Sequence, residues 1–209
     1  MHNRPMDSFR SDTRAEIAAV AARLVVDEGM EYAEAKRRAA RQLGLSGARA
    51  PLPDNGTLEA AVREHIAIFC ADTQPVELRA LRELALGWMD RLASFRPHLC
   101  GAVWHGTATR HSDIRIRLYC DDPKAPEWAL LDERVEYHPG TAGDSHGEPV
   151  EALTLRLFSL PLQQWVLVHL LLLDPMARRA VRKLDEQGRA PEGDADGLRA
   201  LLAASPEAA

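Results

Sequence analysis

The sequence predicts an α+β fold, with N-terminal helices followed by a small, mixed, mostly antiparallel sheet that a C-terminal helix covers. Two observations predict it. Before Arg96 and Pro97, apolar side chains recur at helical spacing, whereas after this pair several segments alternate polar and apolar side chains, as half-buried strands do. The composition agrees, because 46% hydrophobic residues in a chain of 209 exclude wholesale disorder.

Four helices are predicted before Pro97, each bounded by capping residues, glycine or proline. The expected limits are Ser11 or Asp12 to Gly29, residues 32–43 ahead of Gly44, Thr57 to about Phe69, and residues 75–93. Residues 46–56 are rich in proline and glycine, so we expect a loop there.

Four strands and a last helix are predicted after Pro97. The expected strands are residues 98–104, 113–120, 128–137 and 150–158, with a glycine-rich loop between the last two. Residues 160–186 are predicted to return to helix, interrupted near Pro175. We therefore expect a helical lobe over residues 1–74, an α+β domain over 75–187 that shares a core with it, and a loosely ordered tail over 188–209.

Charge, cysteine content and hydropathy exclude several classes of protein. The net charge of −5 gives no global basic surface for nucleic acid. The three cysteines are widely spaced without a CxxC pair, which is typical of reduced thiols in a cytoplasmic protein. The most apolar run, residues 165–173, is far shorter than the ~20 residues of a membrane span, so no membrane association is expected.

A basic helix in the N-terminal half raises the alternative of nucleic-acid binding. Residues 22–46 resemble the start of a helix-turn-helix regulator, and basic side chains of this segment would contact phosphates. The following residues, 47–56, contain two prolines and two glycines, which do not suit a recognition helix. A solvated basic face is therefore the favoured interpretation, and a nucleic-acid partner is not.

The most specific motif of the chain is CGAVWHGTATRHSDIRIRL, residues 100–118. Gly101 and Gly106 bracket a turn, which would permit unusual dihedral angles and leave amides facing an anion such as a triphosphate. Asp113 opens the alternating strand that follows, where a carboxylate could hold Mg²⁺ against the phosphate oxygens.

This stretch resembles the nucleotidyltransferase superfamily, in particular the minimal, polymerase beta-like members. Their signature is a strand ending in Gly-Ser, a second glycine, and then Ser-Asp-hydrophobic-Asp. Gly101, Gly106, Ser112 and Asp113 match it at the family's spacing. The resemblance covers roughly residues 80–120 and implies a nucleotide triphosphate as ligand, held at Gly101, Gly106, Thr107 and Ser112.

Two departures from the family pattern concern the chemistry itself. The serine after the first glycine is Ala102 here, and the second carboxylate of the pair is Arg115. Two-metal catalysis needs carboxylates that converge on the cations, and a guanidinium cannot bind Mg²⁺. Arg115 would instead contact phosphate, so we expect weak Mg²⁺ binding at most.

Another carboxylate could compensate if residues 113–120 and 128–137 form a hairpin. Alignment of their apolar faces places Glu136 opposite Asp113, on the same face and at the same end of the sheet. Glu136 is therefore the candidate for the family's third acidic position, and with Asp113 it forms the candidate catalytic and metal-binding pair. Glu151 is the second choice, because alternation puts it on the apolar side.

The sequence thus favours a nucleotidyltransferase-like protein with a degenerate metal site, which binds a nucleotide, a phosphorylated small molecule or a partner protein. One alternative is an active transferase that uses Asp113 and Glu136 to transfer a nucleotidyl group to a protein or small-molecule hydroxyl. Another is a structural or regulatory interaction module. An alternating strand such as 113–120 could also pair across the edge of a homodimer.

Overall fold

The computed structural model describes residues 4–45, 50–143, 149–180, 184 and 188–204. The chain divides into two compact units, Met1–Gln74 and Pro75–Ala209, which we call unit 1 and unit 2. The buried apolar residues form one cluster within unit 1, and within unit 2 a larger cluster and a small one of Cys100, Ala152 and Leu171. Each unit therefore has a core of its own, rather than the shared core that the sequence predicts.

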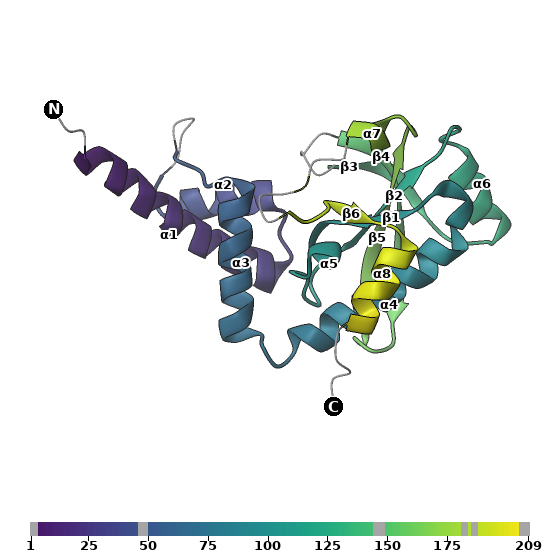
Figure 1. Ribbon diagram of the computed structural model, residues 1–209, viewed down its shortest axis with the longest axis horizontal. Helices are drawn as coiled ribbons and strands as arrows, with labels where there is room; N and C mark the ends of the chain where they lie inside the picture. The colour runs from purple at the N-terminus through teal and green to yellow at the C-terminus, as the bar shows by residue number, and fades with distance from the viewer. Residues whose placement is uncertain (1–3, 46–49, 144–148, 181–183, 185–187, 205–209) are drawn as a thin grey trace. The chain divides into compact units, whose positions relative to one another are not determined.

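Unit 1 consists of three helices, α1 (Arg4–Glu28), α2 (Tyr32–Gln42) and α3 (Asn55–Phe69) (Figure 1). Helix α1 begins before the predicted capping residues. Helix α3 is capped by Asp54 and not by Thr57, since the Asp54 carboxylate accepts a hydrogen bond of 2.7 Å from the Thr57 amide. The core includes Ile17, Leu24, Leu58 and Val62, each at most 2% exposed.

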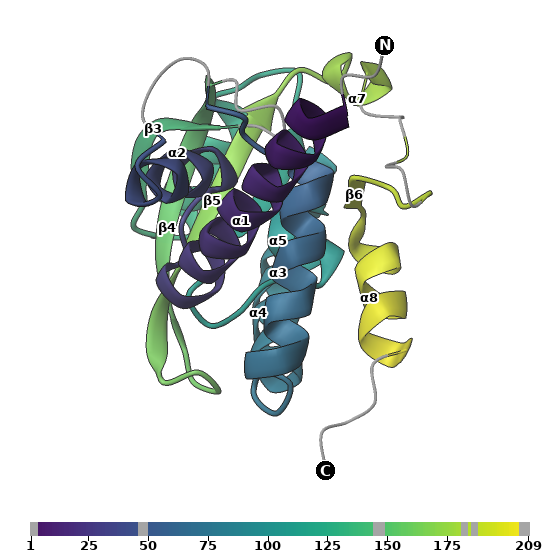
Figure 2. The same cartoon turned by 90° about the vertical axis from the view of Figure 1, so that its left-hand side faces the viewer.

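Unit 2 is built on a six-stranded sheet in the order β3-β4-β5-β2-β1-β6 (Figures 1 and 2). All neighbouring strands are antiparallel except β2 and β5. The strands are β1 (His98–Cys100), β2 (Ile114–Tyr119), β3 (His138–Gly143), β4 (Pro149–Ser159), β5 (Gln164–Leu173) and β6 (Glu192–Gly193). The helical elements are α4 (Gln74–Arg91), η1 (Ala93–Phe95), α5 (Gly101–His105), α6 (Ala125–Asp132), α7 (Ala177–Ala180) and α8 (Ala195–Ala204).

One face of this sheet forms the core of unit 2. Alternate residues of β2, β4 and β5 point to it, and α4 and α8 contribute Leu81 and Leu198. The sheet residues are Ile114, Ile116, Leu118, Leu153, Leu155, Val168 and Leu170, each at most 4% exposed. The predicted α+β class, with a mixed and mostly antiparallel sheet and a C-terminal helix, is confirmed.

Several predicted elements are wrong. Residues 128–137 all belong to α6 and the loop after it, because Pro126 in the first turn favours a helix there. Residues 164–173 form strand β5 instead of a helix, since a short apolar run has no periodicity that separates the two. Only residues 98–100 of the expected first strand are extended, while β3 lies in the expected glycine-rich loop.

The C-terminal residues also differ from the expected loose tail. Strand β6 pairs with β1, and α8 follows it, with Leu198 fully buried. Among the described residues, no helix is both long and apolar enough to span a membrane.

Candidate functional site

Both glycines of the motif have a left-handed conformation, with φ of +69° at Gly101 and +81° at Gly106, in keeping with the unusual dihedral angles expected for them. The residues between them form helix α5 instead of an open turn. The amides of Gly106 and Thr107 both donate to the carbonyl oxygen of Ala102, and Thr107 is buried. These two amides are therefore engaged within the chain and do not face a ligand.

Helix α5 is fixed to α4 by a buried arginine. The Arg82 Nε and Nη2 atoms donate to the carbonyl oxygens of Val103 and Trp104, at 3.1 and 3.2 Å. Arg82 also lies beside Gly106, where an added Cβ would be 3.5 Å from its Nη2. This packing makes the glycine-bracketed segment a structural junction between α4, β1 and β2.

Asp113 belongs to a series of three hydrogen-bonded side chains. Its Oδ2 lies 3.2 Å from His169 Nε2, and the other ring nitrogen, Nδ1, lies 3.0 Å from Thr154 Oγ1. The Asp113 side chain is 38% exposed and that of His169 is 15% exposed. A neutral His169 that donates from Nε2 to Asp113 would accept a hydrogen bond from the Thr154 hydroxyl at Nδ1. We call Asp113, His169 and Thr154 the polar triplet.

Two members of the polar triplet, Thr154 and His169, belong to a row of polar side chains that crosses the whole sheet. The strand register aligns one such residue from each strand on the face opposite the core. In sheet order the row is His138, Thr154, His169, Arg115, Cys100 and Glu192. This face, which we call the polar face, therefore brings basic and acidic groups together from segments distant in sequence.

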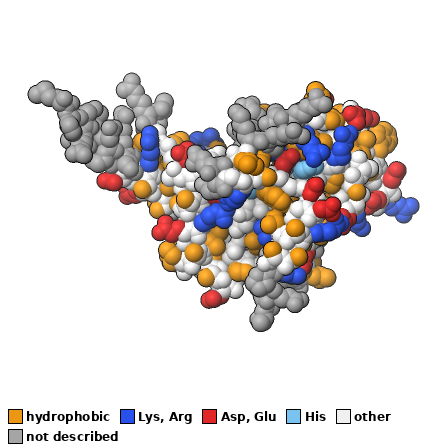
Figure 3. Space-filling view, in the orientation of Figure 1, with side chains coloured by type: hydrophobic (Ala, Val, Ile, Leu, Met, Phe, Trp, Pro, Cys, Tyr) orange, Lys and Arg blue, Asp and Glu red, His pale blue; other side chains and the backbone are white. Residues whose placement is uncertain are grey.

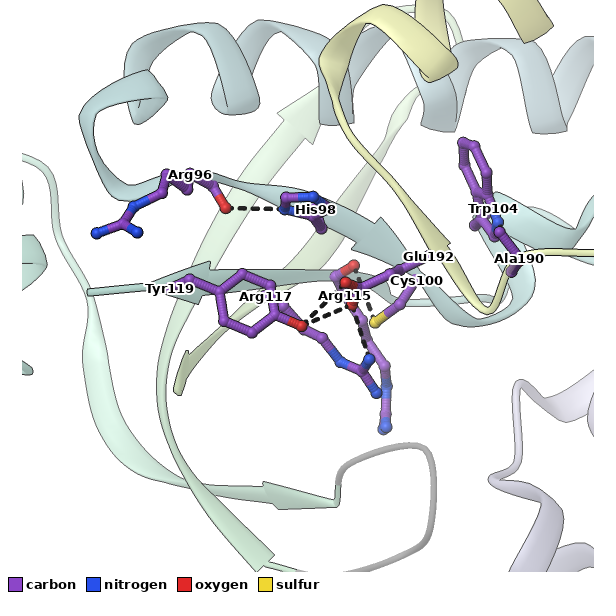
Figure 4. Close-up of polar contacts among 9 residues, drawn as sticks. All are labelled: Arg96, His98, Cys100, Trp104, Arg115, Arg117, Tyr119, Ala190 and Glu192. Carbon is purple, nitrogen blue, oxygen red and sulfur yellow. Dashed lines mark hydrogen bonds and ion pairs between the residues drawn. The ribbon is translucent and has the colours of Figure 1, made fainter. Parts of the chain in front are cut away.

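Arg115 lies at the centre of that row and is half-buried. Its Nη1 donates to the Gly143 carbonyl oxygen at 2.8 Å. In Figure 4, Arg115 and Arg117 extend to the same side of β2, as expected for residues two apart in a strand. Two permanent cations thus follow Asp113 along the same face of this strand.

Arg117 forms a buried ion pair with Glu192 of β6. Their Nη1 and Oε2 atoms are 2.7 Å apart, and the two side chains are only 2% and 8% exposed (Figure 4). The Tyr119 hydroxyl is 2.9 Å from the same carboxylate oxygen. Burial, followed by the negative charge of Glu192, raises the pKa of Tyr119 well above its usual value. Glu192 therefore attaches β6 to the middle of the sheet.

The structure does not contain the hairpin that selected Glu136. The neighbours of β2 are β1 and β5, and Glu136 is an exposed residue of the segment between α6 and β3. Glu151 is exposed at one end of β4, on the core side as expected. Within the described part of the chain, no three His, Cys, Asp or Glu residues are grouped so that they could hold a metal ion.

The other predicted site residues remain near Asp113. Ser112 immediately precedes it and accepts a hydrogen bond of 3.1 Å from the Thr109 amide through its Oγ. Gly101 lies against Arg115, whose Cδ would be 3.7 Å from an added Cβ. The structure thus brings Gly101, Ser112, Asp113 and Arg115 together around the start of β2.

Sequence reasoning missed His169, Thr154 and Glu192. His169 is the only polar residue among residues 165–173, and this was a usable sign that one face of the segment is not core. Its assignment to a helix concealed the pairing with β2. No local pattern marks Glu192, because its role depends on a two-residue strand.

A cavity of about 780 Å³ lies near β6, apart from the polar triplet. Its lining includes Arg96, His98, Trp104, Arg178, Glu192 and Asp194. Figure 3 shows acidic, basic and histidine side chains gathered over this part of unit 2. The lining mixes both signs of charge, so it indicates no single class of ligand.

Comparisons of this chain with protein-family models, with curated proteins and with solved structures found no match.

Proposed function

We propose that unit 2 is a nucleotidyltransferase-like domain that binds a nucleotide or another phosphorylated ligand on its polar face, without efficient nucleotidyl transfer. The observation that carries the proposal is the position of Arg115 and His169 beside the lone carboxylate of Asp113. The Arg115 guanidinium can bind phosphate oxygens through charge-assisted hydrogen bonds, and His169 holds the Asp113 carboxylate beside it.

The donor set around Asp113 does not suit a Mg²⁺ ion. Mg²⁺ requires near-octahedral oxygen coordination, and in proteins of this kind carboxylates supply it. Here one carboxylate oxygen already contacts His169, and the next residue on the same face is a permanent cation. We therefore assign phosphate binding to the protein's own cations and derive no chemical step through a metal.

The polar triplet also supports a binding role, because it fixes the orientation of its side chains. With Asp113 and Thr154 on its two ring nitrogens, His169 is held in a fixed orientation next to Arg115 in the register. A side chain that is already held in place loses less conformational entropy when it contacts a ligand. A phosphate group next to Arg115 would be met by a preorganised site.

The proposal is tested by calorimetric titration of the full-length protein with ATP and with inorganic tripolyphosphate, each with and without Mg²⁺. We expect binding that does not require Mg²⁺ and that weakens about tenfold or more in Arg115→Gln, since a charge-assisted hydrogen bond is worth about 1.5–3 kcal/mol. The matched control is Arg79→Gln, which removes a half-buried arginine paired with Glu83 on α4.

The other outcomes separate the alternatives. Absence of binding by every nucleoside triphosphate would contradict the proposal and favour an interaction module. If the protein transfers labelled nucleotide to an acceptor over many turnovers, and Asp113→Ala abolishes this transfer, an active transferase would be favoured instead.

A further inference from the structure

The polar face continues into an exposed aromatic pair at the hairpin end of β4 and β5. Phe158 and Trp165 are partners in the strand register, and their rings meet edge to face with centroids 5.4 Å apart. Phe158 is 44% exposed and Trp165 is 54% exposed. Two large aromatic side chains in contact on an open sheet face are an unusual surface feature that points to a binding role.

An arginine lies against this pair. The Arg156 guanidinium carbon is 4.6 Å from the centroid of the Trp165 ring, in a cation–π contact. We call Arg156, Phe158 and Trp165 the aromatic platform. It presents both an indole surface and a guanidinium plane, and each of these can stack on a planar ring.

The register connects the platform to the polar triplet. On β4, Thr154, Arg156 and Phe158 alternate with core residues, and on β5 Trp165 and His169 occupy the same face. His169 follows Trp165 by four positions, which corresponds to about 13 Å along a strand. The aromatic platform, His169 and Arg115 therefore lie on one continuous face of unit 2.

We propose that the aromatic platform stacks against the planar base of the phosphorylated ligand, whose phosphates lie towards His169 and Arg115. This inference rests on the proposed function and specifies its ligand as an aromatic phosphate of the nucleotide class. The platform's own Arg156 and the cations that follow it complement an anionic ligand. An apolar surface of another protein would leave these charges unpaired.

The experiment compares ATP with inorganic tripolyphosphate, because only ATP carries a planar aromatic base. The native protein is expected to bind ATP about tenfold more tightly than tripolyphosphate, in keeping with the usual strength of base–aromatic stacking. Trp165→Leu is expected to lower ATP affinity to that of tripolyphosphate and to leave tripolyphosphate binding unchanged. Trp165→Phe, which keeps a ring, is expected to retain most of the preference.

Trp128 provides the matched control, since it is 64% exposed on α6, away from the polar face. Trp128→Leu should bind both ligands as the native protein does. ATP should quench tryptophan fluorescence in the native protein and in Trp128→Leu, but not in Trp165→Leu. Circular dichroism and the thermal midpoint establish that each variant is folded.

Four results would overturn the inference. Equal affinity for ATP and tripolyphosphate in the native protein would contradict base stacking on the platform and leave the proposed phosphate binding intact. A preference for ATP that survives in Trp165→Leu would do the same. Self-association that Trp165→Leu abolishes would assign the surface to a second copy of the chain. No binding of either ligand by the native protein would contradict the proposed function as well.

Discussion

His169 illustrates how one side chain defines the chemistry of a surface. It lies in a strand whose other residues are almost all apolar, and it joins Asp113 to Thr154 through its two ring nitrogens. Replacing it by alanine would leave the Asp113 carboxylate without this partner, beside a row of other polar groups. A second polar cluster of the same face, Arg117, Tyr119 and Glu192, is more deeply buried, which makes its interaction energies larger.

Glu192 is expected to contribute strongly to the stability of unit 2. Removing one partner of a buried ion pair leaves the other charge uncompensated, which costs about 3–5 kcal/mol. Glu192→Ala should therefore lower the free energy of unfolding by about that amount in urea titrations, because Arg117 is only 2% exposed.

Asp196→Ala is the control for this substitution. Asp196 pairs with Arg199 through a side chain that is 91% exposed, and such pairs contribute at most about 1 kcal/mol. A loss of stability as small in Glu192→Ala as in this control would contradict the importance of the buried pair.

Tyr119 predicts a loss of stability at alkaline pH. Its pKa is raised in the folded protein, so above about pH 10 the unfolded chain releases a proton that the folded chain keeps. The stabilising contribution is complete below the unfolded pKa and disappears as pH rises towards the folded one. Unfolding free energies measured between pH 8 and 11 should fall more steeply for the native protein than for Tyr119→Phe. Identical slopes would contradict the burial of an un-ionised Tyr119.

At the scale of elements, β6 is attached by close packing as well as by Glu192. A Cβ at Gly193 would come within 2.0 Å of the Trp104 ring, whose Nε1 donates to the Ala190 carbonyl oxygen at 2.8 Å. Gly193→Ala should therefore displace β6 and lower the thermal midpoint of unfolding.

Gly87→Ala in α4 gives the opposite expectation. No atom lies within 4 Å of the added Cβ, and alanine is favoured over glycine in a helix by up to about 1 kcal/mol. If both substitutions stabilise the protein, the close packing of Gly193 against the Trp104 ring is contradicted.

The elements also show what the sequence could and could not predict. The alternation of residues 113–120 predicted β2 almost to the residue, and glycine located the C-terminal ends of α1 and α2. Strand β5 was missed because a buried run of leucine and valine carries no period, and its parallel pairing with β2 depends on distant contacts. Asp113, Ser112 and Arg115 were recognised from a local motif, whereas His169 and Glu192 join them only through the sheet.

At the scale of the whole molecule, the chain comprises two units with separate cores. Unit 2 contains every residue of the proposed phosphate site and of the aromatic platform. A fragment of residues 71–209 is therefore expected to fold cooperatively and to bind ATP with the affinity of the full chain. Circular dichroism and calorimetry of the fragment test this, and a folded fragment without affinity would mean that unit 1 contributes to the site.

The central claim, that phosphorylated ligands bind on the polar face around Arg115 and His169, is tested most directly by NMR. The amide resonances of the full chain would be followed during titration with ATP. The account predicts shifts concentrated at the start of β2, around His169 in β5 and at the hairpin end of β4 and β5. Shifts confined to the cavity beside β6, near Arg96 and His98, or no shifts at saturating ATP, would contradict it.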